Sequence, residues 1–143
     1  PRNTVPGTVP ITGGEADWSA EWRVGNTAAA DALVNPTGGE ATARGDTLYQ
    51  RFCAVCHGQD GGGSLTVGPR MGAPHLNTDR VRGFSDGYIY SIIRYGRGVM
   101  PRYGDKVHDP ADRWAIVNYV RQLGATAGPP APQAPDDPAG GVQ

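Results

Sequence analysis

The sequence of 143 residues predicts an all-α fold of short helices with an N-terminal extension, and three observations carry this prediction. Apolar residues recur at helical spacing in three segments whose ends are marked by capping residues. The chain contains 22 glycines and 13 prolines, an unusually high share for a helical protein, so the helices should be short and the loops long. Both cysteines fall in one pentapeptide directly after the first helical segment.

The first helix is expected from about residue 40 to residue 53. Ala43, Leu48, Tyr49 and Phe52 can share one face of it. Gly45 lowers helix stability by roughly 1 kcal/mol relative to alanine, so its presence indicates a packing role.

A second helix is expected from Ser85 or Asp86 to Tyr95, with either of the first two residues as its N-cap and Gly96 as its end. Its buried face consists of isoleucines at helical spacing: Ile89, Ile92 and Ile93. Arg94 lies near the C-terminus, where a cation is favoured.

The last helix has the clearest start signal, because Asp109 can cap it and Pro110 fits the first helical position. Asp112 places an acid in the first turn. The apolar stripe of this helix consists of Ile116, Val117, Val120 and Leu123, and Gly124 is expected to end it.

The chain divides into an extension (1–39), a central domain (40–124) and a proline- and alanine-rich tail (125–143). Trp18 and Trp22 are the only large apolar anchors in the extension, and one helical turn is expected around them. Exposing two tryptophans would leave much apolar area in water, so the extension should pack along the domain. The tail is expected to be a linker or a disordered end.

The pentapeptide Cys53-Ala54-Val55-Cys56-His57 matches C-x-x-C-H, the attachment pattern of c-type haem. Two thiols at this spacing can form thioethers with the two vinyl groups on one porphyrin edge, and His57 can place an imidazole nitrogen on the iron. We therefore expect one covalently attached haem c. A zinc site would need a second ligand pair, and His75 and His108 are far apart in the sequence. A redox dithiol would need a βαβ context, which is missing.

Met100 is the expected second axial ligand, in the segment Gly96-Arg97-Gly98-Val99-Met100-Pro101. A glycine-rich loop before a proline can present a thioether to a flat cofactor, and Met/His ligation is typical of electron-transferring cytochromes with raised potentials. A lone methionine is more often core filler. Met71 follows His57 by only fourteen residues, a short distance for crossing to the opposite haem face. His75 or an open site are the remaining alternatives.

Residues 40–124 resemble the class I monohaem cytochromes c, which implies the class I fold of short helices around one haem. The resemblance depends on Gly45, Tyr49, Cys53 to His57, Gly68-Pro69, Met100-Pro101, Trp114 and Tyr119. The stretches 85–94, 98–101 and 111–120 are most similar to the monohaem cytochrome subunits and partners of alternative complex III, a bacterial quinol-oxidising complex.

The resemblance also implies roles for single residues. Gly45 would let the last helix cross the first closely, with Tyr119 packing near Tyr49. The backbone carbonyl of Pro69 would accept the Nδ1 proton of His57, a bond that orients a ligating imidazole.

Other side chains are assigned from the residues alone. Trp114 is expected in the core, and His75 and His108 at the surface. The candidates to neutralise the haem propionates are Arg70, Arg80, Arg82 and Arg97.

Charge is distributed unevenly, although the whole chain carries a net charge of only −1. Residues 1–43 carry five acids and two bases, residues 44–123 carry eleven bases and seven acids, and the tail adds Asp136 and Asp137. Nothing in this pattern indicates nucleic-acid binding. No apolar run approaches the roughly 20 residues of a membrane span. The chain begins at Pro1, so we expect a processed, exported protein at the periplasmic side, with a lipid anchor on an upstream cysteine as an open alternative.

These observations predict a one-electron carrier in a bacterial respiratory chain, acting between a quinol-oxidising complex and a terminal oxidase rather than as an enzyme. The alternative is a cytochrome c subunit docked on such a complex. A third possibility is a haem enzyme or gas-binding protein with an open sixth site, against which Met100 argues.

Overall fold

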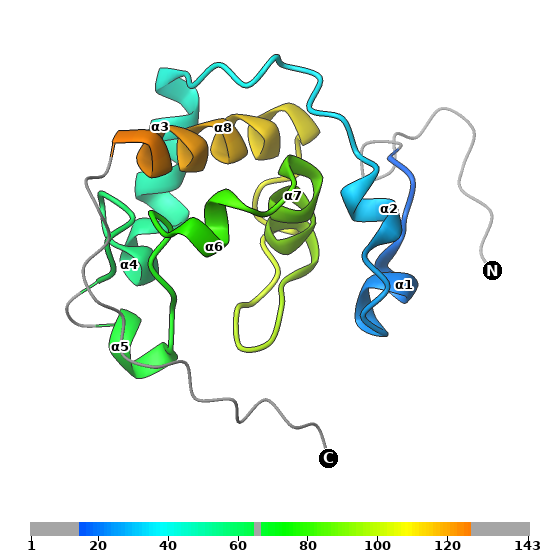
Figure 1. The fold of residues 1–143 in the computed structure, drawn as a ribbon, viewed down its shortest axis with the longest axis horizontal. Helices are drawn as coiled ribbons and strands as arrows, with labels where there is room; N and C mark the ends of the chain where they lie inside the picture. Colours follow the sequence, from blue (N-terminus) through cyan, green and yellow to red (C-terminus); the bar gives the residue numbers. More distant parts are fainter. Residues whose placement is uncertain (1–14, 65–66, 127–143) are drawn as a thin grey trace.

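The chain is all-α over the residues that the computed structural model describes, 15–64 and 67–126, as the sequence predicts (Figure 1). These ranges contain no sheet, and their helices follow one another as α1 (Ser19–Arg23), α2 (Ala28–Asp31), α3 (Ala43–Phe52), α4 (Ala54–His57), α5 (Gly68–Met71), α6 (Asp79–Arg82), α7 (Asp86–Tyr95) and α8 (Pro110–Thr126). The expectations for residues 1–14 and for the tail from residue 127 lie outside the described residues.

Helices α3 and α8 cross at the top of the molecule in Figure 1, and this crossing organises the fold. A Cβ atom at Gly45 would lie 2.3 Å from the backbone oxygen of Ala115, so only glycine permits the contact. The rings of Tyr49 and Tyr119 meet beside it at 5.1 Å. The packing role expected for Gly45 is therefore confirmed.

Helix α7 has the predicted boundaries: the Ser85 side chain accepts a hydrogen bond from the backbone N–H of Tyr88, and Gly96 follows the last turn. Helix α8 begins at Pro110 as expected, and Asp109 Oδ1 accepts from the Ala111 N–H at 2.9 Å. The predicted end of α8 at Gly124 is wrong, because the helix continues to Thr126. Glycine lowers the stability of a helix but does not by itself end it.

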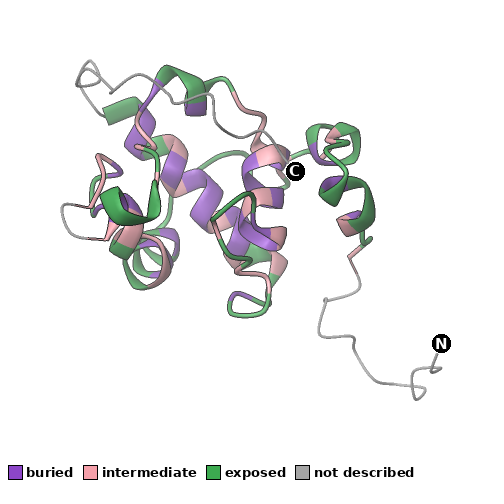
Figure 2. Cartoon of the chain, turned by 90° about the horizontal axis from the view of Figure 1, so that it is seen from below, coloured by how far each residue is buried: buried purple, intermediate pink, exposed green. Residues whose placement is uncertain are grey.

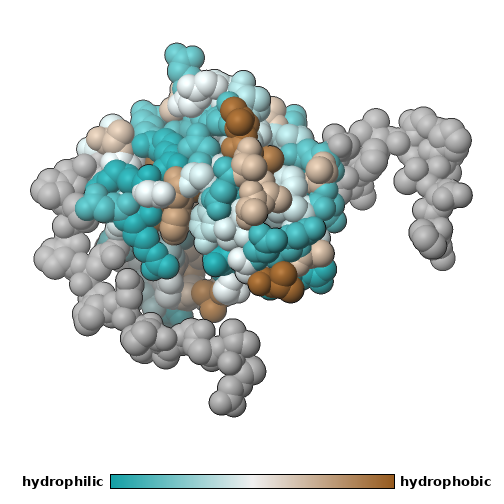
Figure 3. Space-filling view, turned by 45° about the vertical axis from the view of Figure 1, so that its right-hand side comes forward, coloured by the Kyte–Doolittle hydropathy of each residue, from teal (hydrophilic) through white to brown (hydrophobic). Residues whose placement is uncertain are grey.

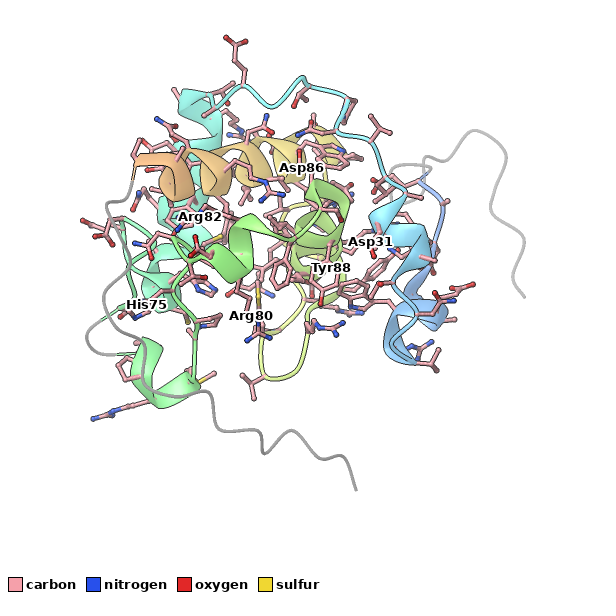
Figure 4. The ribbon with its side chains drawn as sticks, viewed as in Figure 1. Asp31, His75, Arg80, Arg82, Asp86 and Tyr88 are labelled. Atoms are coloured by element: carbon pink, nitrogen blue, oxygen red, sulfur yellow. The ribbon has the colours of Figure 1, made fainter. Side chains whose placement is uncertain are left out.

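Helices α1 and α2 lie against α7 on the side away from α4 and α5 (Figure 1). Both Trp18 and Trp22 are buried there. The helical turn expected around them is α1, which begins at Ser19, one residue after Trp18. A Cβ atom at Gly87 would lie 2.0 Å from the Ala30 backbone oxygen, so α2 rests directly on the backbone of α7. Tyr88 lies on the same side of α7 (Figure 4).

The core runs through α3, α7 and α8, which carry most of the buried positions in Figure 2. Tyr49, Tyr90 and Val117 are wholly buried, and Trp114 stacks on Tyr90 with ring centroids 4.3 Å apart, which confirms its core position. The face in Figure 3 is mainly hydrophilic, with hydrophobic side chains in separate spots. Among residues 15–64 and 67–126, no helix has the length and apolar character needed to cross a membrane.

Candidate haem-binding site

The pentapeptide Cys53 to His57 forms a single helical turn at the junction of α3 and α4. The backbone N–H groups of Cys56 and His57 both donate to the Cys53 carbonyl, at 3.1 and 3.0 Å. Both cysteines are half-buried free thiols rather than a disulfide. The turn therefore places two thiols and an imidazole together, with each thiol available for a thioether bond.

The imidazole of His57 is buried and fixed by one hydrogen bond. Its Nδ1 lies 2.9 Å from the carbonyl oxygen of Pro74, which requires the proton to be on Nδ1 and leaves Nε2 as the ligating nitrogen. Nε2 has no hydrogen-bond partner among the described residues, and no wholly enclosed polar side-chain atom there lacks one. With the proton on Nδ1, Nε2 carries the lone pair that can ligate an iron.

Burial lowers the pKa of His57, and the hydrogen bond to the Pro74 carbonyl opposes this shift only in part. The ring is consequently neutral at pH 7, the form that binds a metal ion.

The acceptor role expected for Pro69 is wrong, because the carbonyl that receives the His57 proton belongs to Pro74. Pro69 lies in the first turn of α5, where carbonyls point along the helix axis. The backbone N–H of Ala73 bonds to the Gly68 carbonyl in this turn. Only after α5 ends does the chain return to the imidazole.

Two glycines hold the following segment against the motif. Gly58 has φ +79°, and a Cβ atom there would lie 2.6 Å from the Gly63 oxygen. A Cβ atom at Gly68 would lie 2.6 Å from the Cys56 oxygen. The Tyr49 hydroxyl donates to the Gly58 carbonyl at 2.8 Å, which ties this segment to α3 as well. Backbone atoms of the segment after the motif therefore lie directly against the motif.

Met100 is half-buried in the loop of residues 96–109 that joins α7 to α8, here called the Met100 loop. Arg97 and Met100 exchange two backbone hydrogen bonds, at 3.1 and 3.0 Å, around a turn that contains Gly98 at φ +57°. The N–H of Tyr103 bonds to the Ile93 carbonyl at 2.9 Å, which returns the loop to α7.

The Met100 loop lies beside the cysteine motif. The ring of Tyr103 contacts the ring of Phe52, the residue before Cys53, at 6.4 Å. Burial raises the pKa of Tyr103, and the charges of Cys53 and Cys56 add to this effect. The structure thus brings together the motif and the loop that the sequence singled out.

The other two candidate ligands are less well placed. Met71 is 46% exposed at the end of α5. His75 is half-buried and packs against Gly63, where a Cβ atom would lie 2.7 Å from its Nε2 (Figure 4). His108 is exposed, as expected.

Arg82 and Arg97, both considered for the propionates, make contacts elsewhere in the chain. Arg82 donates to Asp79, to the Asn77 carbonyl and to the Gly124 carbonyl, the last at 2.8 Å. The Arg97 guanidinium lies over the rings of Trp22 and Tyr88. Arg70 and Arg80 are exposed, on α5 and α6 respectively (Figure 4). A propionate role for either stays a prediction.

The burial of the Cys53 thiol argues against a redox dithiol. Burial raises the pKa of the Cys53 thiol to about 12, with a further contribution from Cys56, whereas a reactive dithiol needs a lowered pKa. Over the described part of the chain, no group of three His, Cys, Asp or Glu side chains is positioned to hold a metal ion.

Comparison with known proteins identifies the family. Residues 40–120 match the model of "Cytochrome C oxidase, cbb3-type, subunit III". The cbb3-type oxidase subunit CcoP of Azospirillum brasilense is 37% identical over 90 residues, which cover 62% of this chain and 30% of that protein. CcoP of Cereibacter sphaeroides is 37% identical over 86 residues (58% and 28%), and FixP of Bradyrhizobium diazoefficiens 35% over 89 residues (60% and 29%).

The chain thus spans less than a third of these relatives, and the residues that match the family model include the C-x-x-C-H motif and Met100. A domain of this kind implies covalently attached haem c, which the free thiols and the oriented imidazole of His57 fit. The chain belongs to the family of cytochrome c domains found in subunit III of cbb3-type cytochrome c oxidases.

Proposed function

We propose that this chain is the electron-transferring cytochrome c domain of a terminal oxidase, docked on the complex at the periplasmic side of the cytoplasmic membrane. The observation that carries the proposal is the match of residues 40–120 to an oxidase subunit family. The earlier expectation of a free carrier becomes the second candidate, since the relatives named above are all oxidase subunits.

The proposed site holds one haem c. Cys53 and Cys56 would form the thioether bonds, and His57 Nε2 and the sulfur of Met100 would ligate the iron. When bound, haem c supplies an iron that takes up and releases one electron. The chain's own residues fix the ligands: the Pro74 carbonyl orients the imidazole, and the Arg97–Met100 turn holds the thioether.

The residues around the site favour electron transfer over catalysis. The Met100 loop is bonded back to α7 through Tyr103 and Gly104, which supports a sixth position that stays filled by Met100. A filled position leaves no place for peroxide or a small gas. Val55 within the motif and Val99 next to Met100 are both exposed, and they offer apolar surface for close approach of a redox partner.

The resemblance of residues 85–94 and 111–120 to the cytochromes of alternative complex III favours the second candidate. In that case the protein carries electrons from a quinol-oxidising complex to a terminal oxidase without being a fixed subunit of either.

Purification of the tagged, haem-loaded protein from the membranes of its own cells separates the two candidates. A docked domain is expected to elute with oxidase subunits at physiological salt, and its deletion should abolish oxygen uptake driven by an artificial donor to the oxidase. Recovery of the protein free of oxidase subunits, with donor-driven oxygen uptake intact after deletion, would contradict docking and support the carrier.

A further inference from the structure

Trp22 is joined to the first residue of the Met100 loop. Its indole Nε1–H donates to the Gly96 carbonyl at 2.8 Å, and the side chain is only 5% exposed. Gly96 has φ +76°, and a Cβ atom there would lie 2.6 Å from the Met100 oxygen. Trp22 therefore binds the carbonyl of Gly96, and the backbone of Met100 packs against the same residue.

Trp22 also contacts the residue that is hydrogen-bonded to Met100. The guanidinium of Arg97 lies 5.2 Å from the centre of the Trp22 ring and 5.3 Å from that of Tyr88. The backbone of Arg97 exchanges two hydrogen bonds with Met100. A displacement of Trp22 would thus free Gly96 and Arg97 together, the two residues that position the turn.

The same N-terminal segment, residues 15–22, reaches the far end of the loop through buried charges. The Glu15 carboxylate pairs with the guanidinium of Arg113, which is only 2% exposed. Arg113 Nη1 donates to the carbonyls of Val107 and His108, at 2.6 and 3.0 Å. These carbonyls lie just before α8, where the loop ends.

Arg94 adds a third connection between the segment and the loop. Its side chain donates to the Ala16 carbonyl at 2.9 Å and pairs with Glu15 at 3.5 Å. Its own carbonyl accepts from the N–H of Gly104, within the loop. Lifting the segment would leave two buried arginines without their carboxylate, which is costly in a low-dielectric interior. The segment and the loop should therefore open together or not at all.

We propose that Trp22 is a positioning residue for the axial methionine, and that the segment 15–22 braces the Met100 loop against release of Met100 from the iron. The proposal rests on the proposed ligation by Met100. Under this proposal the N-terminal segment helps to keep Met100 on the iron, in addition to covering the apolar surface of α7.

The test is the rate at which cyanide binds the ferric, haem-loaded protein, since cyanide can enter only after Met100 has left. The variant is Trp22→Phe, which keeps an aromatic ring and removes the N–H donor. Trp18→Phe is the matched control: Trp18 is similarly buried in the same segment, but its Nε1 donates to Ser91 Oγ of α7 at 3.1 Å instead of to the loop. Far-UV circular dichroism verifies that both variants are folded.

Loss of one hydrogen bond to the loop predicts about two- to tenfold faster cyanide binding in Trp22→Phe. The Trp18→Phe protein keeps an aromatic ring against Arg94 and loses only the bond to Ser91, so it should bind cyanide at the wild-type rate. Equal rates in the two variants would overturn the brace while leaving Met100 ligation in place. If Trp22→Phe does not fold, Glu15→Gln tests the far end of the loop by the same measurement, and an unchanged rate there would overturn the proposal.

Failure of the proposed ligation has a different signature. If the wild-type ferric protein binds cyanide as fast as the Met100→Ala protein, Met100 is not the ligand. The proposed role of Trp22 would then be wrong as well.

Discussion

At the level of single residues, the two axial ligands are held in different ways. His57 is fixed through its own side chain, by the bond from Nδ1 to the Pro74 carbonyl. Among residues 15–64 and 67–126, none forms a comparable bond with the Met100 side chain, which depends on the backbone turn with Arg97 and on the glycines at 96 and 98. Substitutions that leave the Met100 side chain intact can therefore still alter its ligation.

Replacing Met100 by alanine is expected to leave the haem attached, because Cys53 and Cys56 are untouched. The potential should fall, since a thioether ligand favours the ferrous state and its loss removes that preference. The measurements are a redox titration and the ferric absorption spectrum. An unchanged potential and spectrum would redirect the assignment to Met71 or His75.

Among single residues, those in local patterns could be predicted from sequence, and those in long-range contacts could not. The C-x-x-C-H turn and the Ser85 cap depend on neighbours a few positions away. The acceptor for His57 was assigned to Pro69 instead of Pro74, because the choice depends on how the chain runs after α5. The burial of Arg113 could not be foreseen either, since its partner Glu15 lies 98 positions away.

At the level of helices, the crossing of α3 and α8 depends on a missing side chain. Gly45→Ala would place a Cβ atom 2.3 Å from the oxygen and 2.9 Å from the carbon of the Ala115 carbonyl, which is backbone and cannot rotate away. We expect the free energy of unfolding to fall by about 1–3 kcal/mol, since overpacking outweighs the gain in helix propensity. Denaturant unfolding of the haem-loaded protein measures this change.

Gly124→Ala is the matched control on the partner helix. A Cβ atom there meets only the Arg82 Cγ, at 3.6 Å, an ordinary contact. Its stability should be unchanged or rise by up to about 1 kcal/mol. Equal effects of the two substitutions would show that the close crossing does not limit stability.

The three longest helices could be predicted because each has an apolar stripe and a recognisable start. The end of α8 was placed too early at Gly124, since the helix runs on to Thr126 and the Gly124 carbonyl is bonded by Arg82. The short helices α2, α5 and α6 have only four residues each, too few for a periodic signal. Their positions follow from packing alone.

At the level of the whole molecule, ion pairs connect segments that are distant in the sequence. Arg121 and Asn35 both donate to the Asp86 carboxylate, and Arg44 donates to Asp112. Burial raises the pKa of Asp86, but the hydrogen bonds from Asn35 and Arg121 outweigh it and hold the pKa below the usual value. The hydrogen bond from Arg44 likewise lowers the pKa of Asp112.

A lowered pKa in the folded state stabilises the protein above the pKa of the unfolded chain, and this contribution is lost as the pH falls through the folded value. We therefore expect the unfolding free energy to decline below about pH 4, near the ordinary aspartate pKa of 3.8, by less than about 1 kcal/mol per pair. Thermal unfolding measured from about pH 2.5 to about pH 7 tests this expectation. Asp86→Asn should flatten the decline, and an equally steep decline in that variant would exclude Asp86 as a contributor.

The central claim is that this chain carries one haem c, bonded through Cys53 and Cys56. The most direct test is to produce the chain in a host that matures c-type cytochromes and extract it with acidified acetone, which removes haem that is not covalently bound. We predict that one haem per chain stays with the protein, and that Cys53→Ala/Cys56→Ala retains none. A wild-type chain that loses its haem in this extraction, or that binds zinc through its thiols instead, would contradict the account.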